Sequence, residues 1–198
     1  MMRTIIIIIL STVVLAEAKG QIQFSAGPGA GVNYAIHTAP NDVRFSRLDV
    51  LATAQLDMQF SRYLGALVWI DFYSDMSAKL KNNDYSYALA YLSLAPAVKF
   101  CIPGSPFYVY CGPGVGFRTR GRAKGVLYGV SDHAEAIPGM KVRVDVRIGA
   151  GYDIFLSRRL TLSPFAGFNA GLNDVADGSG WRAHALQAGI VLRCNIFK

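Results

Sequence analysis

The sequence predicts an all-β fold: an eight-stranded antiparallel transmembrane up-and-down β-barrel, preceded by a signal peptide. Three observations carry this prediction. Apolar and polar residues alternate with period two over long stretches, which is typical of strands. The chain is 52% hydrophobic and only 17% charged, yet beyond the N-terminal segment it lacks the run of roughly 18 apolar residues that a spanning helix needs. The breaks between the alternating stretches are long and short in turn.

The clearest alternation covers residues 142–156, VRVDVRIGAGYDIFL. Valines and other apolar residues fall on one side, while Arg143, Asp145, Arg147 and Asp153 fall on the other with two glycines. A helix would scatter the arginines among the valines. The segment is longer than the five or six residues common in soluble strands, and it satisfies the about nine to eleven residues that a tilted bilayer-spanning strand needs.

The N-terminus has the organisation of an export signal. Arg3 gives a basic start, residues 5–15 form an apolar stretch too short to span, and Ala16-Glu17-Ala18 has the A-x-A form of a cleavage site. We therefore predict a signal peptide at residues 1–18 and one barrel domain at residues 19–198. The net charge of +7 favours anionic lipids or surface groups as partners of such an exported barrel, rather than nucleic acid.

The first four strands are expected at residues 22–36, 48–60, 63–73 and 85–100. Each has an apolar face, which we place outward, and a second face with glycine or polar residues. The inward residues of the first three include Gly27, Gly29, Gly31, Asp49, Thr53, Gln55, Asp57, Gly65, Trp69, Asp71 and Tyr73. The fourth strand is the least regular, and Leu92, Leu94, Val98 and Phe100 place its outer face.

The last four strands are expected at residues 107–118, 142–156, 160–172 and 183–197. In the fifth, Val109 and Val115 point outward while glycines occupy the inner face. The seventh places Thr161, Ser163 and Asn169 inward, and the eighth closes the chain. An even number of strands leaves both ends of the barrel domain on one side of the membrane.

The breaks between these strands differ in length. Long loops are expected at residues 37–47, 74–84, 119–141 and 173–181, and short turns at residues 61–62, 103–106 and 157–159. Outer-membrane barrels have short periplasmic turns and longer external loops. The pattern therefore predicts an outer-membrane location with the long loops outside.

The three cysteines are Cys101, Cys111 and Cys194. A hairpin turn at residues 103–106 would pair Cys101 with Tyr108 and Cys111 with Val98, which puts the first two cysteines on opposite faces. We favour small apolar packing residues over a disulfide between them.

Several segments resemble the outer-membrane β-barrel domain family of Bacteroidetes-type bacteria, which includes PorT-like proteins, and more broadly the OmpA- and OmpX-like small barrels. They are YLSLAPAVKF, YVYCGPGVGF, VRIGAGYDIFLSRRLTLSPFAGFNAGLND and LQAGIVLRCNIFK, which are similar to the fourth to eighth strands of that family. The resemblance implies insertion by a barrel-assembly machinery. The closing strand is similar to its recognition signal at Gln187, Gly189, Leu192 and Cys194, although Lys198 follows the usual terminal aromatic. The family has no shared catalytic site.

The predicted inward charges have two interpretations. Arg143, Asp145, Arg147 and Asp153 could line a pore or proton path, or they could fill the lumen as an ion-pair network. We favour the network, because an eight-stranded barrel is just wide enough for side chains to fill it, and buried charges need partners. The complementary charges would come from Asp49, Asp57, Asp71, Lys99 and Arg193.

Catalytic and cofactor sites are not expected. Ser131-Asp132-His133 has the residue types of a rim hydrolase, and His37 and His184 are also expected in or beside external loops, but adjacency in sequence does not build a proton relay. No cluster has metal-ligand spacing, and no glycine-rich segment precedes a helix pattern.

The longest loop opens on a basic group. Arg118, Arg120, Arg122 and Lys124 are candidates to contact lipid or surface phosphates, including those of lipopolysaccharide, if that loop is external. A solvated loop with solubilising charge is an equally weighted alternative.

The preferred function is therefore a non-catalytic integral outer-membrane barrel with a structural, surface-interaction or secretion-support role in its loops. One alternative is a lipid-modifying acyl hydrolase or acyltransferase at the membrane rim. The other is a soluble, lipocalin-like binder of a small apolar ligand, in which the aliphatic residues would lie inside.

Overall fold

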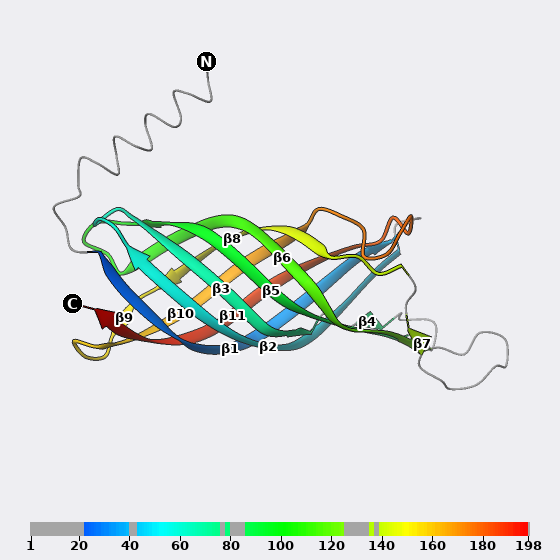
Figure 1. Cartoon of the computed structure of the whole chain (residues 1–198), viewed down its shortest axis with the longest axis horizontal. Helices are drawn as coiled ribbons and strands as arrows, with labels where there is room; N and C mark the ends of the chain where they lie inside the picture. Colours follow the sequence, from blue (N-terminus) through cyan, green and yellow to red (C-terminus); the bar gives the residue numbers. More distant parts are fainter. Residues whose placement is uncertain are drawn as a thin grey trace, which may run out of the picture.

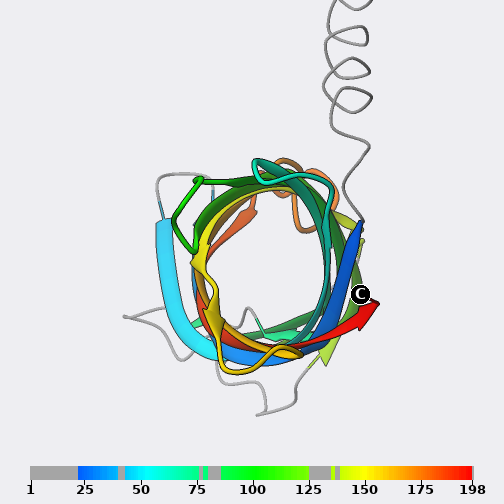
Figure 2. The same cartoon turned by 90° about the vertical axis from the view of Figure 1, so that its left-hand side faces the viewer.

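The computed structural model describes residues 22–39, 43–75, 78–79, 86–124, 135–136 and 139–197. It is a closed barrel of eight antiparallel strands, seen from the side in Figure 1 and along its axis in Figure 2. The barrel strands are β1 (Gln23–Ala39), β2 (Val43–Gln59), β3 (Leu64–Asp75), β5 (Ser86–Cys101), β6 (Phe107–Lys124), β8 (Arg143–Tyr152), β10 (Leu160–Gly171) and β11 (Arg182–Phe197). Short strands β4 (Ala78–Lys79), β7 (Glu135–Ala136) and β9 (Ile154–Phe155) pair with β5, β6 and β10.

Consecutive barrel strands pair with each other, and β1 closes the ring on β11. At that seam Val32 lies opposite Ala188 and Asn33 opposite Gln187. Closure leaves no barrel strand with an unpaired edge, as a bilayer requires of a spanning sheet. None of the described residues forms a helix long and apolar enough to cross a membrane.

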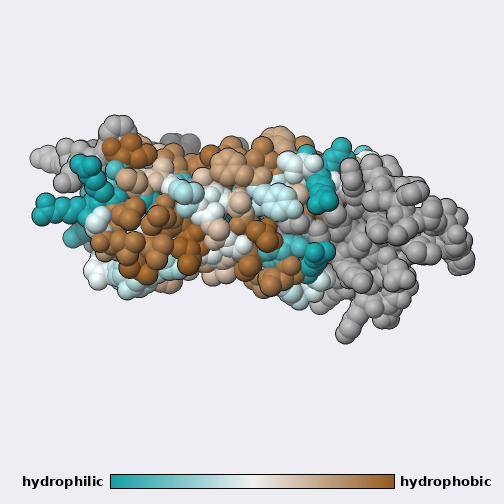
Figure 3. Space-filling model, turned by 90° about the horizontal axis from the view of Figure 1, so that it is seen from below, coloured by the Kyte–Doolittle hydropathy of each residue, from teal (hydrophilic) through white to brown (hydrophobic). Residues whose placement is uncertain are grey.

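The outer face of the barrel is aliphatic and the inner face carries the charges. Ile148 is 56% exposed on the outside, whereas its neighbour Arg147 is 3% exposed on the inside. Figure 3 shows one face of the molecule, on which patches of apolar residues cover much of the described surface and hydrophilic residues gather at the end that carries the short turns. This is the reverse of what the soluble, lipocalin-like alternative requires. The chain is therefore an integral barrel of the outer-membrane type.

The predicted turns and pairing are confirmed at the short-turn end. The turn at residues 102–106 follows β5 and precedes β6, with Gly104 at φ 76°, a conformation that favours glycine. As predicted, Cys101 pairs with Tyr108 and Cys111 pairs with Val98.

The expected loops at the other end are wrong in extent. Residues 37–47 contain strand almost throughout, because β1 continues to Ala39 and β2 begins at Val43. Strand β6 likewise runs on to Lys124. Beyond the lipid, the outward side chains of the strands face water, and the apolar alternation on which the prediction relied is lost. The predicted strand at residues 142–156 also breaks at Asp153, between β8 and β9.

One predicted orientation is wrong because of a β-bulge in β3. The pairing with β5 shifts between Asp71 and Ser74, so that Ser74 is buried and Tyr73 is 38% exposed instead of pointing inward. Phe72 beside it is 58% exposed. A bulge adds one unpaired residue and reverses the alternation after it.

Candidate functional site

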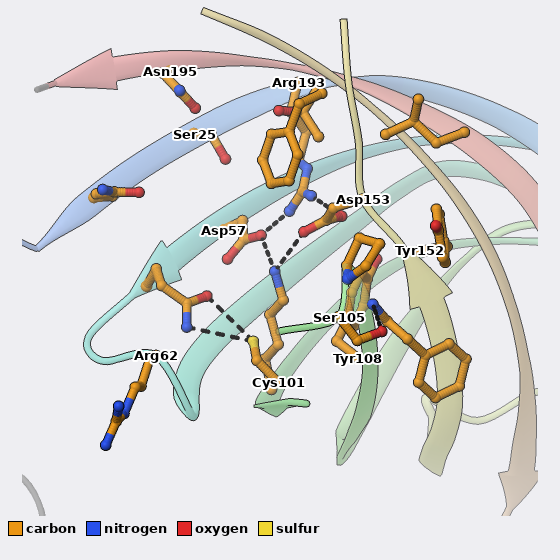
Figure 4. Close-up of a pocket in the computed structure, with 18 of the residues that line it drawn as sticks. Ser25, Asp57, Arg62, Cys101, Ser105, Tyr108, Tyr152, Asp153, Arg193 and Asn195 are labelled. Carbon is orange, nitrogen blue, oxygen red and sulfur yellow. Dashed lines mark hydrogen bonds and ion pairs between the residues drawn. The ribbon is translucent and has the colours of Figure 1, made fainter. Parts of the chain in front are cut away.

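The lumen of the barrel is open at the short-turn end. A cavity of about 710 Å³ lies there, lined by residues of the strand ends and turns that include Ser25, Arg62, Cys101, Ser105 and Asn195. Figure 4 shows these side chains around the opening. The floor of the cavity is formed by ionised side chains, so it does not lead on as an empty channel.

That floor is an ion-pair cluster, here called the lower cluster, made of Asp57, Lys99, Asp153 and Arg193. Lys99 Nζ lies 2.7 Å from Asp57 and 3.1 Å from Asp153. Arg193 pairs with the same two carboxylates, and Ser163 donates a 2.7 Å hydrogen bond to Asp153. Strands β2, β5 and β11 and the β8–β9 break contribute the four members, so the cluster ties opposite sides of the barrel together (Figure 4).

An aromatic layer lies beyond the lower cluster. Trp69 packs on Phe165 at 4.6 Å and on Tyr110 at 5.7 Å between ring centroids. Lys99 Nζ sits 4.3 Å from the centre of the Tyr108 ring, which joins the layer to the charges below it. Among the described residues, the buried hydrophobic members of this layer are Leu51, Leu67, Trp69, Ala95, Ala97, Tyr108, Tyr110, Phe165 and Val191.

A second ion-pair group, the upper cluster, lies on the other side of the aromatic layer and contains Asp71, Arg143, Asp145 and Arg147. Arg147 lies 2.7 Å from Asp71 and 3.3 Å from Asp145, and Arg143 lies 3.2 Å from Asp145. Thr53 donates a 2.8 Å hydrogen bond to Asp71. Together the two clusters hold four cations and four carboxylates, so their formal charges cancel.

The loop at residues 173–181 folds back to cover the far end of the lumen. Its Val175 and Trp181 are buried against Ala35, Leu89 and other residues of the strand ends. Trp181 Nε1 donates a 3.0 Å hydrogen bond to His37 Nδ1. His37, expected in a loop, is instead buried within β1 as part of this cap. The expectation was wrong because the strand extends past the lipid-facing segment.

The five predicted lumen charges all lie inside the barrel, where they belong to two separate ion-pair clusters. Asp153 and Arg193 belong to the lower cluster, while Arg143, Asp145 and Arg147 belong to the upper one. Each group is completed by carboxylates or a lysine from other strands. Each of these buried charges has at least one ion-pair partner, and such an arrangement suits packing and cross-linking of the barrel wall more than transport or proton exchange.

The predicted basic group lies at the long-loop end. Arg118 and Arg120 are exposed and line a groove of about 620 Å³ with the aromatic residues Phe72 and Tyr73. The backbone of Arg122 and Lys124 continues β6, and their side chains lie outside the described part of the structure. The expected external orientation of this end remains a prediction.

The candidate catalytic groups are not assembled by the described residues. His184 lies on the outer face, accepts a 3.2 Å hydrogen bond from the Gly171 amide and stacks on Phe168. Residues 131–133 lie outside the described part. Across the described residues, no group of three or more His, Cys, Asp or Glu side chains could hold a metal ion.

The cysteines lead to a labelling prediction. Cys101 lines the open cavity, whereas Cys111 is exposed on the lipid-facing surface. In vesicles of phosphatidylcholine, a hydrophilic maleimide should modify a variant with Cys101 alone and spare one with Cys111 alone, with both labelled in denaturant. A mild oxidant should leave wild-type Cys101 and Cys111 unlinked by mass spectrometry. A Cys101–Cys111 disulfide would contradict their placement on opposite faces.

Comparison with known proteins finds structural neighbours of low sequence identity. No protein-family model and no curated protein matches it. Among solved structures, Ail, the attachment invasion locus protein of Yersinia pestis, is 12% identical, with 86% of this chain and 99% of Ail covered and a TM-score of 0.49. Neisserial surface protein A is 16% identical, with coverages of 87% and 97% and a TM-score of 0.49. The N-terminal barrel domain of Pseudomonas aeruginosa OprF is 14% identical, with coverages of 89% and 100% and a TM-score of 0.44. The assignment as a small outer-membrane barrel rests on this chain's own strand pairing and surface.

Proposed function

We propose that this protein is a closed, non-catalytic outer-membrane barrel that works through its external end. Its role would be structural, or would consist of surface interaction or support of a secretion or assembly system, as its resemblance to PorT-like proteins suggests. Lipopolysaccharide, the barrel-assembly machinery and a surface or secretion protein are the partners that this proposal implies.

The observation that supports the proposal best is the layered filling of the lumen. A solute would have to cross two ion-pair clusters, the aromatic layer between them and the cap at residues 173–181. Opening either cluster would leave buried charges without partners, which costs about 3–5 kcal/mol for each broken pair. The packed rings of Trp69, Tyr110 and Phe165 add an apolar barrier that ions enter only at a high desolvation cost.

Ion conductance tests this proposal. Wild-type protein refolded into planar bilayers should give no discrete conductance steps, whereas a porin in the same bilayer should. The Trp69→Ala/Phe165→Ala variant should raise ion leakage from vesicles several-fold, because it empties the middle of the aromatic layer. The matched control Phe100→Ala/Phe117→Ala removes two rings from the lipid-facing surface, and it should stay closed.

Regular conductance steps from the wild-type protein would refute the closed lumen. A lipid-hydrolysis and acyl-transfer assay on the same preparation tests the non-catalytic part separately. Turnover that is lost in His133→Ala would replace the proposal by a rim enzyme. Both assays use protein whose barrel has been checked by its heat-dependent migration in detergent gels.

A further inference from the structure

The groove at the long-loop end combines cationic and aromatic side chains. It is formed where β3 bulges beside β5 and where β5 and β6 shift register at Ala90 and Tyr91. Its lining residues are Phe72, Tyr73, Ala90, Arg118, Thr119, Arg120 and Gly121. Bulges in β3 and β6, the two strands that flank β5, thus place two exposed aromatic rings and two guanidinium groups around one hollow of the surface.

The two guanidinium groups are available to a ligand. Neither Arg118 nor Arg120 makes an ion pair or a side-chain hydrogen bond with any residue that the structure describes. By contrast, the lumen arginines Arg143, Arg147 and Arg193 all pair with carboxylates. Two neighbouring guanidinium groups can bind the oxygens of one phosphate with strong, charge-assisted hydrogen bonds.

The groove lies at the edge of the lipid-facing band. Phe117, 52% exposed, ends the apolar outer face of β6, and Arg118 follows it directly. The lipid-facing band ends at the same level on the neighbouring strands, at Phe72 on β3 and at Leu92 on β5, since Leu92 pairs with Phe117. Lipid headgroups occupy this level of a bilayer, and aromatic side chains favour it.

We propose that this groove binds a phosphate monoester of an outer-leaflet glycolipid, with Arg118 and Arg120 holding the phosphate. Phe72 and Tyr73 would then contact the sugar and the start of the acyl chains. A lipid fits better than a soluble phosphate because one wall of the groove is continuous with the hydrocarbon-facing surface. The proposal rests on the external orientation of this end, and it deepens the proposed function by assigning the glycolipid phosphate to a defined site.

Lipid retention tests the proposal. The full mature barrel is refolded in detergent with equal amounts of bis-phosphorylated lipid A and its fully dephosphorylated form, and retained lipid is counted by native mass spectrometry. The wild type should retain the phosphorylated form preferentially. Arg118→Gln/Arg120→Gln should lower this preference about tenfold, which corresponds to the loss of about one charge-assisted hydrogen bond.

The matched control is Arg158→Gln/Arg159→Gln, which removes the same charge from an exposed arginine pair in the short turn at the opposite end. It should retain lipid like the wild type. Equal losses in both double variants would show unspecific attraction to the net charge and overturn the site. Displacement of the lipid by millimolar inorganic phosphate would assign the groove to a soluble anion and overturn the lipid as occupant. Because lumen conductance is measured separately, failure here is distinguishable from failure of the closed barrel.

Discussion

Replacing Asp57 with alanine is expected to lower the free energy of unfolding by about 3–5 kcal/mol. Asp57 pairs with both Lys99 and Arg193, and the three side chains are only 6%, 3% and 2% exposed. Without it, two buried cations share the single carboxylate of Asp153. The measurement is urea unfolding of the protein refolded into phospholipid vesicles.

The control for this prediction is an ion pair of similar length whose side chains are exposed to solvent. Lys141 lies 2.6 Å from Asp177, and their side chains are 44% and 72% exposed. Asp177→Ala should cost less than about 1 kcal/mol, as exposed ion pairs do. If Asp57→Ala and Asp177→Ala had equally small effects, the lower cluster would not be a buried cross-link of the barrel.

The second large effect is expected on the outer face. Ile148→Arg should destabilise the barrel by about 2–4 kcal/mol, because Ile148 lies near the middle of the lipid-facing part of β8 and an arginine there must enter hydrocarbon. Val142→Arg, just before the same strand, should cost only about 0–1 kcal/mol, because its guanidinium reaches the headgroups. Both are measured by urea unfolding in vesicles of one composition.

A substitution at an inward-facing position distinguishes destabilisation by a clash in the lumen from destabilisation by placing a charge in lipid. A Cβ added at Gly149 would lie 2.5 Å from the Tyr110 ring, so Gly149→Val should impair refolding by a clash inside the lumen. This defect should be insensitive to bilayer thickness, whereas the cost of Ile148→Arg should fall in a thinner bilayer. Equal tolerance of arginine at Ile148 and Val142 would contradict a membrane-embedded outer face.

The inward and outward faces of the strands could be predicted from the sequence, because the bilayer hydrocarbon outside and the polar lumen inside select very different side chains. Hydrocarbon selects aliphatic residues at every second position, so Val144, Val146 and Ile148 identify the outer face of β8 without any tertiary information. The same rule places Asp57, Asp71 and Lys99 inside. It fails at Tyr73, because a bulge leaves no mark in the alternation of a strand near its end.

The partners of the inward residues could not be predicted in the same way. Strand tilt and stagger decide which charges meet across the lumen, and neither is encoded in the period of one strand. Leu51, Leu67 and Phe165 interrupt the polar inner face, and this apolar signal could have predicted the aromatic layer. The buried contact between His37 and Trp181 joins residues 144 positions apart and has no local signature.

The pairing of tyrosine with glycine inside the barrel bears on how the strands find their alignment. A slip of β8 by two residues would still present aliphatic side chains to the bilayer, so the lipid cannot detect the error. The interior can, since Tyr110 faces Gly149 and Tyr108 faces Gly151. A slip would set Tyr110 against Arg147 in one direction and Tyr108 against Asp153 in the other. The fit of side chains inside the barrel therefore selects the correct register of β8, whereas contact with lipid does not distinguish it from a two-residue slip.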